Sequence, residues 1–262
     1  MPTIKVAEQA GVGIDGAPRP SEDHVVILEN AVVLLDGATA PAPGLPPGGW
    51  YAGLLAAELA DALRAKPEED LRALLSGAIA AVAAAHDLHP GASPSSTVAM
   101  LRWTTSRIDG LVLADSPVVA FGPAGADPLT DDRLARLRRS GRLNTTAEVH
   151  ALRNRPGGFW VAEATPAAAS RARCRSWPRG SLDAVLLASD GVSVGVDDYG
   201  LFDWPQVLTA ARERGLSSVL EAVRAAERTD PRGKRWPRAK VHDDQALVLV
   251  EFDGAELGQS AE

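Results

Sequence analysis

The chain has 262 residues, of which 45% are hydrophobic and 23% charged, so it can bury one substantial core and is too balanced in composition to be disordered. Its 27 Lys and Arg against 34 Asp and Glu give a formal charge of -7. This balance argues against a nucleic acid or a membrane surface as partner, because both require cationic faces. A single cysteine, Cys174, excludes an intramolecular disulfide framework and a Cys-rich zinc site. Any bound metal must therefore have oxygen or histidine ligands.

The first residues, MPTIKVAEQAGVG, contain no apolar run behind a basic start, and no stretch approaches the roughly 18 apolar residues of a membrane span. We therefore expect a cytoplasmic protein. The abundance of Ala, Arg, Gly and Pro is typical of a GC-rich bacterial coding sequence.

The N-terminal third predicts a hairpin followed by a helix pair. Two apolar runs within 25–35 are separated by Glu29-Asn30, which is the spacing of a two-residue turn, and the second run ends at Asp36. Apolar residues at helical spacing predict one helix over about 50–65. A one-sided stripe predicts a second over 71–82, packed antiparallel to the first.

The remainder is rich in short strand-like runs. An Arg-rich, weakly periodic segment, 131–157, predicts a loop or short helices. Asp203 and Ser217 each precede an apolar periodic run and are predicted N-caps of a second helix pair. Val- and Leu-rich runs bounded by Gly, Pro or Asp predict strands at 95–103, 110–116, 117–121, 159–164, 171–177, 183–189 and 245–252.

The order of elements is strands, two helices, several strands, two helices and one last strand. Without strict strand-helix alternation, this order predicts an α+β fold, an antiparallel sandwich with helices packed outside, and not a doubly wound sheet. We expect a single domain over 1–254 and a flexible tail over 255–262.

Two catalytic or cofactor motifs are weak. Gly11, Gly13 and Gly16 fit G-x-G-x-x-G, but the prolines that follow prevent the helix that a dinucleotide site needs. Ser193 lies in a G-x-S-x-G match with His242 as a later base, but VGVDDYG is a poor helix opening, so a plain turn is favoured. The histidines form no tight ligand pair, and Cys174 is expected to pack within a strand.

Acidic residues mark the ends of several apolar runs. One such residue alone is an ordinary turn acid, but a buried carboxylate is costly unless it is paired or bound to a cation. Converging carboxylates are the ligands that Mg²⁺ or Mn²⁺ requires, and two such ions a few Å apart can activate a water. The acids concerned are Glu22, Asp23, Asp36, Asp115, Asp190 and Asp243.

At these residues the sequence resembles the metal-dependent protein phosphatase 2C (PPM-type) family, bacterial branch. The matching stretches occur in the family's order: SEDHVVI (21–27), VVLLDGA (32–38), SSTVAML (95–101), VLADSPVVAF (112–121), LLASDGV (186–192) and HDDQALVLV (242–250). The resemblance implies a four-layer α-β-β-α sandwich of two antiparallel sheets flanked by helix pairs. It also implies hydrolysis of phosphoserine or phosphothreonine monoesters by direct attack of a metal-activated water, without a phosphoenzyme.

The resemblance also implies roles for residues. Two or three Mn²⁺ or Mg²⁺ ions would be bound. Asp36 would bridge two ions, the Gly37 carbonyl would contact one of them, and Asp190 and Asp243 would complete the ligands of the other. Glu22 and Asp23 would hold metal-bound waters, and Asp115 with Asp190 would hold a third ion.

Several positions depart from the family pattern. The DGxGG turn is DGATA here, with Ala38 where animal members carry a histidine proton donor. Arg19 lies one residue closer to the acidic pair than the family's phosphate-binding arginine. Asp244 replaces the more usual Asn and adds a negative charge. Ala114 stands in ADS where the family usually has Gly-Asp-Ser, and Pro117 stands where that triplet is often followed by Arg.

A basic segment, RGKRWPRAK (232–240), leads directly into the last acidic pair. Its charge could draw in an anionic substrate, with Arg235 and Arg238 as binding residues beside Arg19; a solvated loop is the equal alternative. The favoured function is thus a metal-dependent phosphatase acting on a phosphorylated protein. A small-molecule phosphatase and a catalytically weak phosphatase-like binding module remain alternatives, and the oligomeric state stays open.

Overall fold

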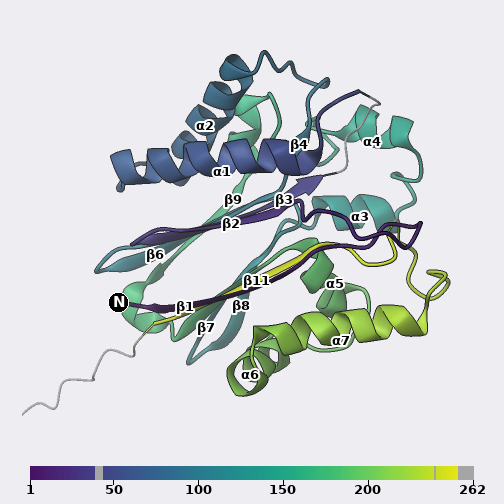
Figure 1. Cartoon of the computed structure of the whole chain (residues 1–262). Coiled ribbons are helices and arrows are strands. Elements are labelled where there is room, and N and C mark those ends of the chain that lie inside the picture. Colours follow the sequence, from purple (N-terminus) through teal and green to yellow (C-terminus); the bar gives the residue numbers. More distant parts are fainter. Residues whose placement is uncertain (39–43, 239, 253–262) are drawn as a thin grey trace, which may run out of the picture.

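The computed structural model describes residues 1–38, 44–238 and 240–252. Two antiparallel sheets face each other; α1 and α2 cover one, and α6 and α7 cover the other (Figure 1). The predicted α+β sandwich of four layers is therefore confirmed. The predicted tail, 255–262, and Thr39 and Ala40 of the DGATA turn lie outside the described residues. No described helix is long and apolar enough to cross a bilayer.

The first sheet has the strand order β2-β3-β5-β6-β9, with β4 paired to β3. The predicted hairpin is confirmed, with Leu28 adding one residue to the turn, and its register places Asp23 opposite Asp36. The strands are β2 (Asp23–Ile27), β3 (Ala31–Ala38), β4 (Ser95–Ser96), β5 (Val98–Trp103), β6 (Arg107–Leu113) and β9 (Arg173–Pro178).

The second sheet has the order β1-β11-β10-β7-β8. Its first and last strands in that order were not predicted, because one has a weakly apolar sequence and the other, GADPL, contains Asp and Pro. Strands β6 and β7, which follow each other in the chain, lie in different sheets. The members are β1 (Thr3–Gln9), β7 (Val118–Gly122), β8 (Gly125–Leu129), β10 (Ala184–Ala188) and β11 (Gln245–Glu251).

The helix pairs begin largely where capping chemistry predicts. Asp70 accepts hydrogen bonds from two backbone N–H groups at the start of α2, and Asp203 forms a capping box on α6. The Ser217 cap was wrong, since α7 begins after Gly215, whose φ is 85°. The helices are α1 (Gly48–Ala65), α2 (Leu71–Ala85), α3 (Arg133–Arg139), α4 (Thr146–Leu152), α5 (Asp190–Asp197), α6 (Trp204–Arg214) and α7 (Leu216–Thr229), with 3₁₀ turns η1 (Pro166–Arg171) and η2 (Arg179–Ser181).

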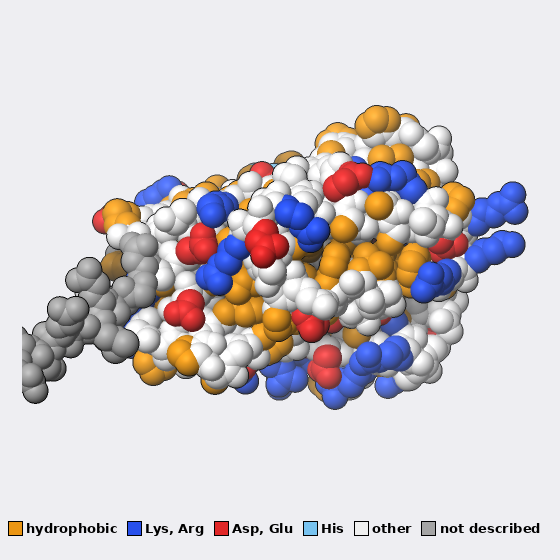
Figure 2. All heavy atoms as spheres, turned by 90° about the horizontal axis from the view of Figure 1, so that it is seen from below, with side chains coloured by type: hydrophobic (Ala, Val, Ile, Leu, Met, Phe, Trp, Pro, Cys, Tyr) orange, Lys and Arg blue, Asp and Glu red, His pale blue; other side chains and the backbone are white. Residues whose placement is uncertain are grey.

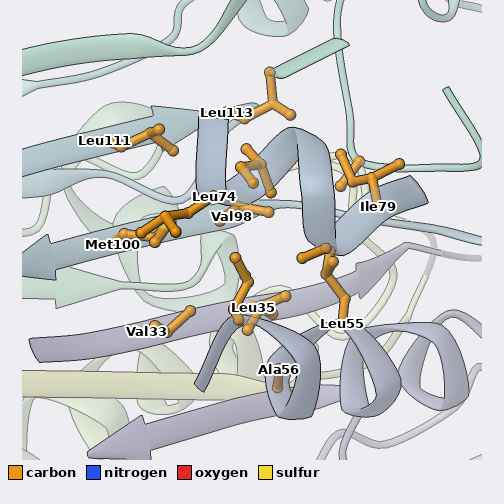
Figure 3. Close-up of a cluster of buried hydrophobic side chains, with 14 of the residues drawn as sticks. Val33, Leu35, Leu55, Ala56, Leu74, Ile79, Val98, Met100, Leu111 and Leu113 are labelled. Atoms are coloured by element: carbon orange, nitrogen blue, oxygen red, sulfur yellow. The ribbon is translucent and has the colours of Figure 1, made fainter. Parts of the chain in front are cut away.

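Each sheet is buried on both faces. On β3, Val33 and Leu35 point toward α1 and α2, where they meet Leu55 and Ile79 (Figure 3). Between them, residues such as Leu34 face the opposite sheet, because successive side chains on a strand alternate in direction. This double burial explains why the strand reads as a continuous apolar run that ends in a carboxylate.

Three further expectations were wrong. Segment 159–164 forms isolated bridges and no named strand, although Phe159 is buried against Ala114 and Leu137. Cys174 is exposed, because β9 is the edge strand of its sheet. Segment 190–197 does form a helix, α5, with its Ser193 buried.

The face that carries α6 and α7 shows Lys or Arg and Asp or Glu side chains next to one another over much of its area (Figure 2). Ion pairs account for part of this mixture, among them Arg212 with Glu251 and Arg228 with Glu221. Such exposed pairs contribute little to stability.

Candidate active site

The acidic residues predicted from the sequence come together at one end of the sandwich. The end of β3, the start of α5 and the loop before β11 meet there, at the end opposite the N-terminus (Figure 1). Burial, above all, raises the pKa of Asp36 well above its usual range, and the charges of Asp23 and Asp243 add to the effect. The pKa of Asp190 is likewise raised by burial and then by the charges of Asp36 and Asp243. These carboxylates are therefore close enough to repel one another in a dry environment.

Asp23 is the most isolated member of the cluster. Its residue is 4% exposed, and neither carboxylate oxygen has a hydrogen-bond partner among the described residues. Burial raises its pKa well above the usual range, the Ser189 hydroxyl opposes that shift, and the charges of Asp190 and Asp244 add to it. A buried carboxylate with so little hydrogen bonding is unfavourable, so this side chain needs a cation or a proton.

Asp36 is held firmly at the end of β3. Its backbone N–H donates to Thr97 Oγ1 at 3.1 Å, and its carbonyl accepts from the Thr97 N–H and the Ser96 hydroxyl, both at 2.9 Å. Its charge raises the pKa of the Asp190 carboxyl group, so the two carboxyl groups lie close to each other. Two carboxyl groups in such contact need a proton or a cation between them.

Both of these aspartates are followed by a glycine, and close packing explains why. A Cβ on Gly37 would lie 2.3 Å from the amide nitrogen of Gly49, at the start of α1. A Cβ on Gly191 would lie 1.9 Å from the Asp244 carbonyl oxygen. Each Asp-Gly pair thus lets another backbone segment approach the site.

Asp115 lies at the rim, with 21% of its side chain exposed. Burial raises its pKa, and the charge of Arg138, whose Nη1 lies 3.4 Å from Asp115 Oδ2, opposes that shift. The preceding residue, Ala114, has a φ of 70°, a conformation that favours the glycine usual in the resembling family. Sequence reasoning missed Arg138 because α3 lies in a segment without a clear pattern.

The C-terminal acidic pair has a cation of its own. Lys240 Nζ lies 2.6 Å from Asp243 Oδ1, 3.4 Å from Asp244 Oδ2 and 4.0 Å from Glu22 Oε2. Burial lowers the pKa of Lys240, but the charge and hydrogen bond of Asp243, with the charge of Asp244, raise it above its usual range. Lys240 was not among the predicted site residues, since its contacts depend on loop conformation.

Asp244 and Glu22 tie this pair to the backbone. The Asp244 carboxylate accepts from the Gly11 N–H at 2.6 Å and the Glu22 N–H at 3.2 Å. Glu22 Oε1 accepts from the Gly49 N–H at 3.2 Å. The carboxylates therefore hold the N-terminal segment, β2 and α1 around the site.

The predicted substrate-binding arginines lie in different settings. The Arg238 guanidinium donates to the carbonyl oxygens of Val241, Trp236, Glu227 and Asp230, so it holds its own loop together. Arg235 is exposed, with its guanidinium carbon 4.3 Å from the centre of the Trp236 ring. Arg19 is exposed and pairs with Asp15 at 3.3 Å. Of these three arginines, Arg235 and Arg19 have guanidinium groups exposed to solvent.

His242 and Ser193 do not form a nucleophile-base pair. His242 Nδ1 lies 2.5 Å from Glu227 Oε2, and Glu227 Oε1 accepts from the Tyr199 hydroxyl at 3.1 Å. Ser193 lies inside α5 and is 4% exposed. The nucleophile elbow is thus disfavoured by the placement of the serine within the helix, and not by the lack of a helix.

The oxygen ligands around Asp23, Asp36 and Asp190 fit a divalent cation better than those around Asp243. No three Asp, Glu, His or Cys side chains in 1–38, 44–238 and 240–252 are already spaced as ligands of one ion. The unpartnered oxygens of Asp23 and the Asp36–Asp190 carboxyl pair nevertheless require compensating positive charge. Asp243, in contrast, already has the Lys240 ammonium.

No family model matches the sequence, and no curated protein matches it. Solved structures do. Serine/threonine phosphatase Stp1 from Staphylococcus aureus is 16% identical, with 97% of this chain and 96% of that one covered and a TM-score of 0.64. The Mycobacterium tuberculosis serine/threonine phosphatase PstP/Ppp is 17% identical over 96% of this chain and 99% of that one, with a TM-score of 0.59. A PstP catalytic domain in complex with two manganese ions is 15% identical, with 95% and 97% covered and a TM-score of 0.58.

These likenesses cover nearly the whole length of both partners in each pair. At identities this low they establish the fold. The chain therefore has the fold of the bacterial PPM-type serine/threonine phosphatases, as the sequence resemblance implied.

Proposed function

We propose that the protein is a metal-dependent phosphatase that hydrolyses phosphate monoesters, with phosphoserine or phosphothreonine in a protein as the favoured substrate. The observation that carries the proposal is the cluster of Asp23, Asp36 and Asp190, whose pKa values are all raised and in which the buried Asp23 carboxylate has no hydrogen bond of normal geometry. It lies at the end of a fold shared with serine/threonine phosphatases. Perturbed carboxylates in such a setting are typical of functional sites.

Mn²⁺ or Mg²⁺ is the proposed cofactor, held by Asp36 and Asp190 with Asp23 close by. When bound, such an ion polarises a phosphoryl oxygen and lowers the pKa of water. The chain's own part is to fix the ligand geometry. The Thr97 and Ser96 bonds hold Asp36 in place, and the glycine after each aspartate lets another backbone segment pack closely beside it.

Arg138 is a candidate to bind the phosphate. It reaches from α3 to Asp115 while 57% of its side chain remains exposed, and its charge also acts on Asp190. A guanidinium is well suited to two phosphate oxygens. Arg19 and Arg235 stay proposed contacts for the rest of an anionic substrate.

Purified protein, stripped of metal and then given Mn²⁺ or Mg²⁺, should hydrolyse p-nitrophenyl phosphate. Phosphoserine and phosphothreonine peptides should be better substrates than small phosphorylated metabolites, as judged by kcat/KM. Arg138→Ala should raise KM, whereas the exposed Cys174→Ala serves as a matched control with unchanged rates. Full activity of metal-stripped protein, or a trapped phosphoenzyme, would rule out the proposal.

The alternative, a catalytically weak phosphatase-like binding module, is favoured by the ion pair between Lys240 and Asp243. The same assay separates the two functions. A binding module would retain phosphopeptide affinity, measured by calorimetry, without metal-dependent turnover.

A further inference from the structure

Lys240 lies where its ammonium meets three carboxylates from two distant parts of the chain. Asp243 and Asp244 precede β11, and Glu22 precedes β2. The ammonium carries three N–H donors and acts as a compact point charge, unlike the planar guanidinium. The choice of residue is informative, because this chain has four lysines among its 27 basic residues.

The backbone between Lys240 and Asp243 restricts where this ammonium can go. Val241 N–H and His242 N–H both donate to the Val12 carbonyl, at 3.0 and 3.2 Å, and Val12 N–H donates to the His242 carbonyl at 2.7 Å. The Arg238 guanidinium donates to the Val241 carbonyl at 3.1 Å. The loop is therefore tied down directly after Lys240.

The charge of the cluster differs between its two halves. In the first half, which holds Asp23, Asp36 and Asp190, neither Asp23 oxygen accepts a hydrogen bond of normal geometry from the described residues. In the second half, Asp244 adds a carboxylate whose side chain is 4% exposed, and the Lys240 ammonium offsets part of the negative charge. The first half therefore needs a cation from solution, whereas the second half already contains the Lys240 ammonium.

We propose that the Lys240 ammonium is a built-in cation that takes the place of one divalent ion beside Asp243 and Asp244. The site then binds a single divalent ion, at Asp36 and Asp190, instead of the two or three expected from the sequence. This inference rests on the proposed metal-dependent function, and it concerns the number of ions, which can be measured without turnover.

The test is the Mn²⁺ stoichiometry of the full chain, measured by equilibrium dialysis with elemental analysis and by electron paramagnetic resonance. We expect one ion per wild-type chain, with the spectrum of an isolated Mn²⁺. Lys240→Met should bind one ion more and show the exchange coupling of two neighbouring ions. Lys234→Met, in the same loop but exposed and outside the cluster, should leave the count at one.

A second variant guards against misfolding of the first. Lys240→Met combined with Asp244→Asn removes one positive and one negative charge, so it keeps the net charge of the cluster, and it too should gain an ion. Thermal unfolding establishes that each variant is folded. Two ions in the wild-type chain, or no gain in both variants, would overturn the role of Lys240.

Hydrolysis of p-nitrophenyl phosphate, measured on the same samples, separates this inference from the proposed function. A gain of one ion without turnover in any sample would support the role of Lys240 and refute the phosphatase. Turnover with an ion count that does not change between the wild-type chain and the variants would support the phosphatase and refute the role of Lys240. The absence of Mn²⁺ binding in all samples would refute both.

Discussion

Two aspartates of the first sheet, Asp109 and Asp36, show opposite electrostatics. Asp109, on β6, accepts hydrogen bonds from Arg102 and Arg107, both at 3.0 Å, and from the Ser176 hydroxyl at 2.6 Å. Burial alone would raise its pKa, but these three donors lower it below the usual value. Asp36, on β3, has other carboxylates as its charged neighbours, and its pKa is raised.

The difference separates structural from functional burial of charge. A buried carboxylate with cationic donors holds the fold together, and removing one partner leaves the other uncompensated. A buried carboxylate among other carboxylates costs stability, so its presence calls for a ligand. Four predictions test this comparison.

The largest effect is expected at Asp36. Asp36→Asn should lower kcat/KM by at least about 1000-fold, because charge stabilisation by a bound ion contributes several kcal/mol. The same change should raise the midpoint of thermal unfolding in EDTA, since it removes a repelled charge. Turnover assays and calorimetry check the two parts, and a drop in the midpoint would contradict the comparison.

At Asp109 we expect the opposite pattern. Asp109→Ala should destabilise the protein by about 3 kcal/mol, because it leaves the Arg102 side chain, 3% exposed, without its carboxylate. Urea unfolding measures this loss. The activity of the folded fraction should stay near normal, and Arg107→Ala, on the exposed side of the same aspartate, is a milder control.

The pH dependence of stability should also differ. A raised pKa means that the folded chain binds protons that the unfolded chain has lost, so stability falls as pH rises above the usual 3.8 of Asp36 and Asp190. The lowered pKa of Asp109 acts in the other direction, with stability lost as pH falls below 3.8. Between pH 5 and 8 in EDTA, therefore, the unfolding midpoint should decline. Saturating Mg²⁺ should flatten the decline, and a midpoint that rises with pH in EDTA would contradict this account.

The smallest effect is expected at Ala114, whose φ of 70° is strained for an L-residue. Ala114→Gly should stabilise the protein by up to about 1 kcal/mol, since relief of strain exceeds the entropic cost of glycine. Thermal unfolding checks this change. Ala120→Gly, on β7 and without positive φ, should destabilise instead.

Much of the site was predictable because it depends on local patterns. Strand β3 is apolar on both faces up to Asp36, and an acid at the end of such a strand cannot avoid partial burial. The capping residue Asp203 was equally predictable, since a cap acts within one turn. The strand predicted at 159–164 failed because its apolar residues pack beneath a loop instead of pairing.

By itself, then, the sequence determined most of the strands, the two helix pairs and the acids at strand ends, which follow from hydrophobic periodicity and turn chemistry. Only the tertiary structure decided which charges meet. The Arg238 guanidinium donates to a carbonyl of its own loop, whereas Arg138 contacts Asp115 and Lys240 contacts Asp243. The physical reason is that a long side chain on a loop can reach several partners, and the choice depends on hydrogen bonds between residues far apart in sequence, such as those between Val12 and His242.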